Sequence, residues 1–599
     1  MTTTPDRQRV LEGIPGQREG AVERPEGGGG APARTSEVPR VLTDVHHGGH
    51  VLADEVPRVD PDRRSADGMR WVAVEERSTP FGYMFKDLQG LYPAAHLPVE
   101  PSAAVVASLK ALGAAMVEQP PSAAGDSTVP PIYTYWGQFV DHDLTANTDR
   151  DDDLSITDLP LQPLQPEKVV HKLRNLREPQ LNLDSVYGNG PDASGKEDQV
   201  PYEEDGRLAI ETGLSPVAPV AGQSDQAQVP GADLKRVNKK AQIGDARNDE
   251  NLIIAQLHLA FLKFHNEVLR WLPEHPEVTV PGNGTFARTR QLVEWHYQWI
   301  TVHDFLKRLT DEEVFTGLVV DRTIKPKLEL DEATLPDEVF MPLEFSVAAY
   351  RFGHSMIRGA YDWNENFGAP GTRSPSSPFG LLFLFTGNGG LGGNPTLPDN
   401  WPARFERLTG AEPRPSGTPD NVPVRLARKI DTRIASPLAD LSNEGANEIS
   451  DRTRRLLKRL AVRNLLRGYR LAIPTGQAVA RSLGITPLTR EQLITVPVPG
   501  QRPVPPSPVD DALIDGGFLE DTPLWFYVLK EAEVIGKGER LGPVGSRIVA
   551  ETILGQLRAD PTSFLNQTPE WDPSQGVTLD GGAQVDSITT FLQFAKVHP

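Results

Sequence analysis

The segment 135–145 places a histidine between two acids, with a glutamine one helical turn earlier. Gln138 and His142 are four residues apart, so on a helix their side chains would share a face. Asp141 and Asp143 are two residues apart, which is about 200° around a helix axis, so they would point to nearly opposite sides. A buried acid needs a bonding partner, and a histidine titrates near neutral pH. The segment therefore offers a histidine and an acid to one site and a second acid to another.

Three further segments carry residues suited to acid–base or ligand chemistry. Taken singly, each has an ordinary explanation. A buried histidine is usually a hydrogen-bonded core residue, and an arginine three residues before a glutamate can form an ion pair at a helix start. The segments are 244–251 with Arg247 and Glu250, 350–354 with Arg351 and His354, and 463–470 with Asn464.

Helices must position these side chains, because apolar residues recur at helical spacing while period-two alternation is scarce. The clearest helix is 250–272, for which Asn248 is the predicted N-cap. The Pro/Gly-rich stretches 364–425 and 497–517 are predicted to be loops laid over the helical core. The predicted fold class is therefore mainly α, with helices at 102–118, 131–144, 250–272, 284–308, 344–358, 449–468, 523–533 and 542–559.

The composition divides the chain into two parts. Residues 1–79 contain a run of four glycines, many charges and few aromatic residues, which predicts a poorly ordered N-terminal extension. Residues 80–599 carry the helical patterns and all the candidate site residues. We expect them to form one large catalytic domain.

Composition also excludes several classes of partner and cofactor. The net charge of −20 argues against nucleic acid as the main partner. The absence of cysteine excludes thiolate-ligated haem, iron–sulfur clusters and cysteine-ligated zinc. No apolar run reaches the roughly 18 residues of a membrane span, and the first residues lack a signal-peptide core. We expect a cytoplasmic or non-classically secreted protein, and the oligomeric state stays open.

In this order, the motifs resemble those of the animal haem peroxidase superfamily, also called the peroxidase–cyclooxygenase superfamily, and its bacterial members most of all. The resemblance runs from about residue 81 to residue 596. It implies a mainly helical domain around a buried haem, with long irregular loops. The motifs that carry it are Trp-Gly-Gln-Phe-Val-Asp-His-Asp-Leu at 136–144, Arg247-x-x-Glu250 with His265-Asn266, Arg351-Phe352-Gly353-His354, Leu183-Asp184-Ser185-Val186-Tyr187-Gly188, and the segment 542–549.

The resemblance assigns roles on the distal side of a haem b. His142 would take a proton from hydrogen peroxide and return it to the leaving oxygen. Arg247 would stabilise the negative charge that develops as the O–O bond breaks. Gln138 would help to hold distal water or a small anionic substrate. Asp141 and Glu250 match two carboxylates that form ester bonds to haem methyl groups in several members, so both esters are chemically possible here.

On the proximal side, the resemblance makes His354 the ligand of the haem iron. Asn464 would accept a hydrogen bond from the other ring nitrogen of His354, which orients the ring and raises its donor strength. Arg351 would lie close to the haem on the same side.

The resemblance also implies a calcium site. Asp143 and Asp184 match its firmest ligands, since calcium binds several carboxylate and carbonyl oxygens. The other matching positions hold oxygen-bearing residues, but they depart from the vertebrate pattern of threonine, phenylalanine carbonyl, aspartate and serine. A sodium ion or a hydrogen-bonded substitute is the alternative. The other matching positions of the predicted calcium site are Glu178, Gln180 and Asn182.

Three functions fit these residues. The first is a haem peroxidase that uses hydrogen peroxide to oxidise halide, thiocyanate or small organic donors. The second is a fatty-acid dioxygenase or peroxygenase of the same superfamily, whose radical tyrosine lies three residues before the proximal histidine. Arg351 holds that position and Tyr350 is offset by about 100° on a helix, which favours the peroxidase. The third is a non-catalytic haem-binding module, against which the complete set of site residues argues.

Overall fold

The structure is a computed structural model of the 599-residue chain. The predicted N-terminal extension lies outside the described residues, apart from β1 (Val45–His46), β2 (His50–Val51) and the start of β3 (Thr79–Gly82). The boundary of the catalytic domain at residue 80 stays a prediction. The structure describes residues 45–46, 50–51, 79–118, 123–146, 156, 160–188, 190–191, 200–217, 228–278, 284–328, 339–368, 377–387, 389–412, 424–441, 451–494 and 507–599.

The long helices lie where apolar spacing predicts them, and the mainly α fold class is confirmed. Each buries the face on which its apolar residues recur, because that face is removed from water when the helices pack. These helices are α4 (Ser102–Ala115), α5 (Ile132–Leu144), α8 (Leu252–Trp271), α9 (Thr285–Ile300), α20 (Leu524–Val534) and α21 (Pro543–Ala559).

Two predicted helices are interrupted. The helix expected at 344–358 is three short pieces, because Ala348 has φ −130° and ψ −81°. The helix expected at 449–468 is divided at Arg459, which has φ −94° and ψ 89°. The pieces are α12 (Leu343–Ser346), η10 (Ala349–Phe352) and α13 (Gly353–Met356) in the first case, and α15 (Asp451–Lys458) and α16 (Leu460–Arg470) in the second.

Asn251, and not Asn248, caps α8. The Asn251 side chain accepts a hydrogen bond from the backbone N–H of Ile254 at 3.1 Å. Asn248 lies in the preceding 3₁₀ turn, η4 (Ala246–Asp249), so the prediction that it caps the helix was wrong. Its side chain is turned toward His142 instead.

The predicted loop 364–425 is mostly irregular where it is described, with η11 (Phe379–Phe383), η12 (Gly390–Gly393) and α14 (Phe405–Leu408) as short turns. The predicted loop 497–517 was wrong in its second half, which contains α19 (Pro508–Asp515). Ser507 closes a capping box there, and proline is tolerated in the first helical turn because no intrahelical bond is lost.

The remaining elements are short. The helices among them are α3 (Lys86–Gln89), α6 (Pro166–Lys172), α7 (Asp184–Tyr187), α10 (Lys307–Leu309), α11 (Glu312–Phe315), α17 (Gly476–Ser482), α18 (Arg490–Leu493) and α22 (Ile588–Phe594). The other strands are β4 (Val117–Glu118), β5 (Arg174–Asn175), β6 (Ile210–Glu211), β7 (Asp233–Leu234), β8 (Arg236–Val237), β9 (Lys240–Ala241), β10 (Met341–Pro342) and β11 (Ile434–Ala435).

The strands form small sheets that tie distant segments together. β3 pairs with β10 in parallel and with β5 antiparallel, and β11 pairs with β4 in parallel. In the described part of the chain, no helix is both long enough and apolar enough to cross a membrane.

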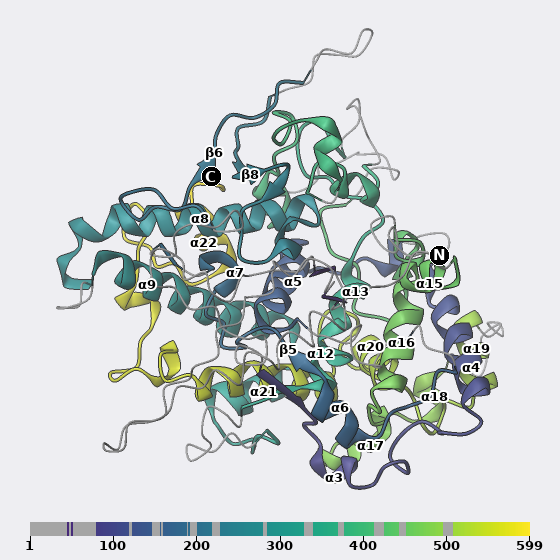
Figure 1. Cartoon of the computed structure of the whole chain (residues 1–599). Helices are drawn as coiled ribbons and strands as arrows, with labels where there is room; N and C mark the ends of the chain where they lie inside the picture. The colour runs from purple at the N-terminus through teal and green to yellow at the C-terminus, as the bar shows by residue number, and fades with distance from the viewer. Residues whose placement is uncertain are drawn as a thin grey trace, which may run out of the picture.

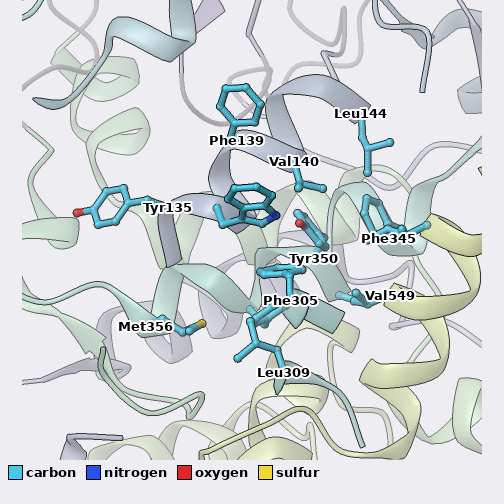
Figure 2. Close-up of a cluster of buried hydrophobic side chains, with 14 of the residues drawn as sticks. Tyr135, Phe139, Val140, Leu144, Phe305, Leu309, Phe345, Tyr350, Met356 and Val549 are labelled. Carbon is cyan, nitrogen blue, oxygen red and sulfur yellow. The ribbon is translucent and has the colours of Figure 1, made fainter. Parts of the chain in front are cut away.

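Helix α5 lies at the centre of the described fold, with α8, α9 and α22 on one side of it and α4, α15 and α16 on the other (Figure 1). Phe139 of α5 stacks on Phe261 of α8, with ring centroids 4.2 Å apart. Helix α9 continues into one π-helical turn, η7 (Thr301–Leu306), which packs against α5. Gly137 permits this approach, because a Cβ there would lie 3.0 Å from the ring of Phe305. Figure 2 shows Phe305 and Tyr350 next to each other at this junction.

Candidate active site

A cavity lies between α5, the η10–α13 turn and the loop around η11. About 870 Å³ of space in this region is not filled by atoms, open solvent included. Its polar lining comes from Tyr133, Tyr135, Gln138, Asp141, Glu250, Asn251, Tyr350, Arg351 and His354, and its apolar lining includes Phe305, Phe379, Phe383, Leu438, Leu441 and Leu460.

One wall of the cavity, called here the distal wall, is formed by Gln138, Glu250 and Asn251. The Gln138 amide nitrogen donates to Glu250 Oε1 at 2.5 Å. The Asn251 amide nitrogen donates to Gln138 Oε1 at 3.3 Å. The two residues predicted at 138 and 250, which are far apart in sequence, therefore fix each other at the edge of the cavity.

Asp141 also borders the cavity. Thr145 Oγ1 donates to Asp141 Oδ1 at 3.0 Å. Burial raises the pKa of the Asp141 carboxyl, although the charges of Arg351 and Arg247 act in the opposite direction. Asp141 thus contributes a hydrogen-bonded carboxyl to the lining of the cavity.

His142 and Arg247 lie behind the distal wall and do not border the cavity. Arg247 Nη2 donates to the backbone carbonyl of His142 at 2.8 Å. Burial, followed by the charge of Arg247, lowers the pKa of His142 to about 3, so its ring is neutral at pH 7. Gln138 and His142 therefore share a helix, but only Gln138 lines the cavity.

Asn248 fixes the orientation of the His142 ring, a role that sequence reasoning missed. Asn248 Oδ1 lies 2.8 Å from His142 Nδ1, and Asn248 Nδ2 lies 3.1 Å from His258 Nδ1. An amide oxygen can only accept, so Nδ1 of His142 carries the proton and Nε2 carries the lone pair. The sequence signal was only that Asn248 follows Arg247 directly.

Asp245 holds Arg247 in place and was also missed. Arg247 Nε lies 3.1 Å from Asp245 Oδ1, and Arg247 Nη2 lies 2.7 Å from Asp245 Oδ2. Arg177 bonds to Asp245 as well, and it reaches Asp184 at 3.1 Å. Burial alone would raise the pKa of Asp245, but Arg177 and Arg247 hold it well below its usual range. Arg247 thus pairs with Asp245, and the interpretation of an ion pair with Glu250 is not supported, since Glu250 accepts from Gln138.

The predicted calcium residues gather at the far end of this charge network. Asp143 is fully buried, and burial followed by the charge of Asp184 raises its pKa well above the usual range. Oδ1 of Asp143 and Oδ1 of Asp184 are buried without a hydrogen-bond donor among the described residues. Two buried carboxylates with unbonded oxygens fit a hard cation, since such oxygens otherwise carry a desolvation cost.

The loop positions predicted to complete that site are bonded mainly to one another. Asn182 Nδ2 donates to Glu178 Oε2 at 3.3 Å, and Asn182 Oδ1 accepts the backbone N–H of Asp184 at 3.2 Å. The carbonyl of Gln180 lies 3.5 Å from Gln298 Nε2. Among the described residues no group of three or more His, Cys, Asp or Glu side chains is arranged to hold a metal. Of the five predicted calcium residues, Asp143 and Asp184 are the two that keep a buried carboxylate oxygen without a hydrogen-bond donor among the described residues.

On the opposite side of the site, His354 of α13 borders the cavity and contacts Asn464 of α16. Asn464 Nδ2 lies 2.9 Å from His354 Nδ1. The amide therefore donates a hydrogen bond to the ring, whereas the sequence predicted that Asn464 would accept one. Asn464 Oδ1 is buried and has no donor within the described chain. A half-turn of the amide would give this oxygen the ring N–H and leave Nε2 for a metal. The unbonded oxygen therefore fits the predicted iron ligation.

Arg351 lines the cavity beside His354, as its spacing suggests, and its Nε donates to the carbonyl of Ser346 at 3.0 Å. Tyr350 differs from the expectation that its ring turns away, because it also lines the cavity. Its hydroxyl donates to the carbonyl of Gly137 at 3.1 Å.

Part of the chain is similar to known peroxidases. Residues 175–379 match the family model of animal haem peroxidase. A peroxidase-like protein of Margaritifera margaritifera is 30% identical over 132 residues, which cover 21% of this chain and 15% of that protein. Peroxidase mlt-7 of Caenorhabditis elegans is 25% identical over 256 residues, covering 38% of this chain and 33% of that protein. The matched regions thus span a third or less of either relative.

Among solved structures, peroxidase A of Dictyostelium discoideum shares the fold, with a TM-score of 0.53 and 15% identity over 87% of this chain and 94% of that chain. A fatty acid alpha-dioxygenase of Arabidopsis thaliana has a TM-score of 0.45 and 14% identity over 86% of this chain and 74% of that chain. The second likeness is too weak to decide between the two kinds of enzyme.

Proposed function

We propose that the chain belongs to the peroxidase–cyclooxygenase superfamily and that residues 80–599 form a haem peroxidase domain, which the match of residues 175–379 to the animal haem peroxidase family model supports. It would use hydrogen peroxide to oxidise halide, thiocyanate or small organic donors. The observation that carries the proposal is the cavity, which His354 borders from α13 and which Gln138, Asp141 and Glu250 border from the distal wall.

The residues present fit a haem. His354 would hold the iron through Nε2, with its other ring nitrogen on Asn464, and Arg351 would lie beside the same face. The bound haem would supply the two-electron redox chemistry of peroxide reduction. Phe379, Phe383 and Leu460 would cover apolar surface of the group and keep water out.

On the distal side, His142 would move the proton. Its neutral ring holds a lone pair on Nε2, because Nδ1 is committed to Asn248. Nε2 would accept a proton from one oxygen of hydrogen peroxide and donate it to the other as that oxygen leaves. The guanidinium of Arg247, locked by Asp245, would stabilise the developing negative charge. Because His142 lies behind the distal wall, the proton reaches it only when the Gln138 side chain shifts or when a water molecule carries the proton past it.

Asp141 and Glu250 are the residues that would join the haem by ester bonds, since both carboxyls border the cavity. Asp143 and Asp184, with Glu178, Gln180 and Asn182 as further oxygen donors, would hold calcium next to the last turn of α5. A filled calcium site would thereby fix the helix that carries His142.

The test is to express the chain with haem supplementation and to record absorbance spectra before and after hydrogen peroxide. We expect a Soret band that shifts on peroxide addition. No Soret band, or a band that peroxide leaves unchanged, contradicts the peroxidase. Extraction with acidified organic solvent tests the esters, because haem that leaves the protein freely was not bound by Asp141 and Glu250.

A fatty-acid dioxygenase is the second candidate, because Tyr350 lines the cavity against expectation and apolar side chains form much of the lining. Its hydroxyl, however, is held by the carbonyl of Gly137. Oxygen uptake on adding an unsaturated fatty acid without peroxide, lost in Tyr350→Phe, would favour this function over the peroxidase.

A further inference from the structure

The cavity and a surface groove share the π-helical turn η7 as a common wall. Phe305 of this turn lines the cavity, while His303 lines the groove with Trp299 and Lys307. Asp304 lies between them in sequence and bonds to Tyr133, which lines the cavity. Single π-helical turns are frequent at functional sites.

Tyr133 differs from the other cavity tyrosines in its hydrogen-bond partner. Its hydroxyl donates to Asp304 Oδ1 at 2.6 Å, whereas Tyr350 donates to a backbone carbonyl. A phenol that loses one electron becomes a strong acid, so its proton must go to a base at once. A carboxylate is such a base, and a peptide carbonyl is not.

Asp304 is held ready for this role. Its Oδ2 accepts the backbone N–H of Ile588 at 2.8 Å, which leaves Oδ1 aimed at Tyr133. Burial is the main influence on Asp304 and raises its pKa, which makes the carboxylate a better proton acceptor. Burial followed by the charge of Asp304 raises the pKa of Tyr133 strongly, so the phenol keeps its proton until it is oxidised.

The groove offers a platform for an aromatic ring. Trp299 and His303 stack with ring centroids 3.9 Å apart, and both border the groove. Val320 on the rim is 65% exposed. Lys307 and Arg540 bring positive charge, and Glu312, Asp572 and Asp586 bring negative charge, so the lining has no excess of cations that would select an anionic donor. This chemistry suits an uncharged phenol, which stacks through its ring and bonds through its hydroxyl.

We propose that Tyr133 and Asp304 form a proton-coupled electron relay through which a phenolic donor in the groove of Trp299 and His303 reduces the oxidised haem without entering the cavity. The relay rests on the proposed peroxidase function. With this relay, the electron donors would include phenols that are attached to molecules too large to enter the cavity.

The electrons and protons balance over two turns of the relay. In each turn Tyr133 gives one electron to the oxidised haem and its phenolic proton to Asp304. The donor phenol then gives one electron to the Tyr133 radical, which recovers its proton from Asp304, and the donor's own proton leaves to solvent. Hydrogen peroxide takes two electrons and two protons, its O–O bond breaks, and two waters form. Two phenols thus become two phenoxyl radicals for each peroxide.

The first test is electron paramagnetic resonance of the haem-loaded chain, frozen shortly after peroxide addition. We expect a tyrosyl signal that Tyr133→Phe removes and that the matched variant Tyr350→Phe retains. In Asp304→Asn the phenol stays but the base is lost, so the signal should fall at least about tenfold. A signal that persists in Tyr133→Phe overturns the relay. A wild-type haem that ignores peroxide overturns the peroxidase and the relay together.

The second test uses a phenol linked to dextran, with iodide as the small donor for comparison. The wild type should oxidise both. The ratio of dextran-phenol to iodide oxidation should fall at least about tenfold in Tyr133→Phe and in Trp299→Leu. A wild type that oxidises iodide but not the tethered phenol, or ratios that do not change, would refute the relay while leaving the peroxidase intact.

Discussion

The two sides of the cavity are secured by different kinds of interaction. Behind the distal wall, Arg247 is paired with the buried carboxylate of Asp245, and the side-chain amide of Asn248 bonds both His142 and the buried His258. On the proximal side, His354 borders the cavity beside an amide whose oxygen has no donor in the described chain. The distal side is thus held by an ion pair and by a side-chain amide that bonds two histidines, whereas the proximal histidine contacts an amide that can still turn. We expect haem binding to turn that proximal amide and to leave the distal ion pair in place.

The largest effect is expected from His354→Ala. The iron would lose its protein ligand, so the Soret band and peroxide turnover should both disappear. Because this side chain borders the cavity, added imidazole should enter the space and restore part of the spectrum. A variant that binds haem and turns over peroxide as the wild type does would show that His354 is not the ligand.

His142→Ala should slow peroxide reduction at least about 100-fold, the lower range for a lost acid–base group, while haem stays bound. Stopped-flow spectra of the first peroxide reaction would measure it. Since His142 does not border the cavity, imidazole should not restore the rate. Rescue equal to that of His354→Ala would abolish the contrast between the two sides.

Asp245→Asn should destabilise the fold by roughly 3 kcal/mol, because it leaves the buried charges of Arg247 and Arg177 without their shared partner. Urea unfolding would measure the loss. The matched control is Asp205→Asn, which removes an exposed pair with Arg207 and should leave the midpoint unchanged. Equal midpoints for the two variants would mean that the distal network contributes no stability.

Calcium should raise the melting temperature by several degrees, because it would satisfy the buried oxygens of Asp143 and Asp184. Thermal unfolding with added calcium and with a chelator would measure the shift. Asp143→Asn should remove the calcium response. If the wild type melts at the same temperature with calcium and with the chelator, the buried oxygens of Asp143 and Asp184 do not bind calcium.

The smallest effect concerns pH. Asp245 has a lowered pKa, so its contribution to stability is lost as pH falls. Glu344 of α12, which leads to the proximal turn, accepts the backbone N–H of Met84 at 2.9 Å, and burial raises its pKa to about 7. Its contribution is full below its ordinary pKa and is lost as pH rises through about 7. Between pH 5 and 7 the free energy of unfolding, obtained from melting curves, should therefore fall by about 2 kcal/mol less in Glu344→Gln than in the wild type. A parallel fall in both proteins would contradict this.

Much of the fold followed from local pattern. The apolar faces of α5, α8 and α21 predicted those helices, because a helix of this length must bury a face wherever it packs. The breaks at Ala348 and Arg459 were not predictable, since their backbone angles depend on packing against other elements. Helix α19 was missed because proline and glycine dominate its surroundings, although the serine–proline start is itself a helix signal.

The candidate site divides in the same way. The sequence by itself determined which residues are candidates for the site, because the motifs give the residue types and their order. It also determined that Asp141 and Asp143 point to opposite sides of α5, because they are two residues apart on one helix. Only the tertiary structure decided which of them border the cavity, that Asp245 and Asn248 hold Arg247 and His142 behind it, and that Tyr133 meets Asp304. The physical reason is that spacing fixes directions around one helix, whereas a hydrogen bond between residues 171 positions apart exists only once the helices have packed.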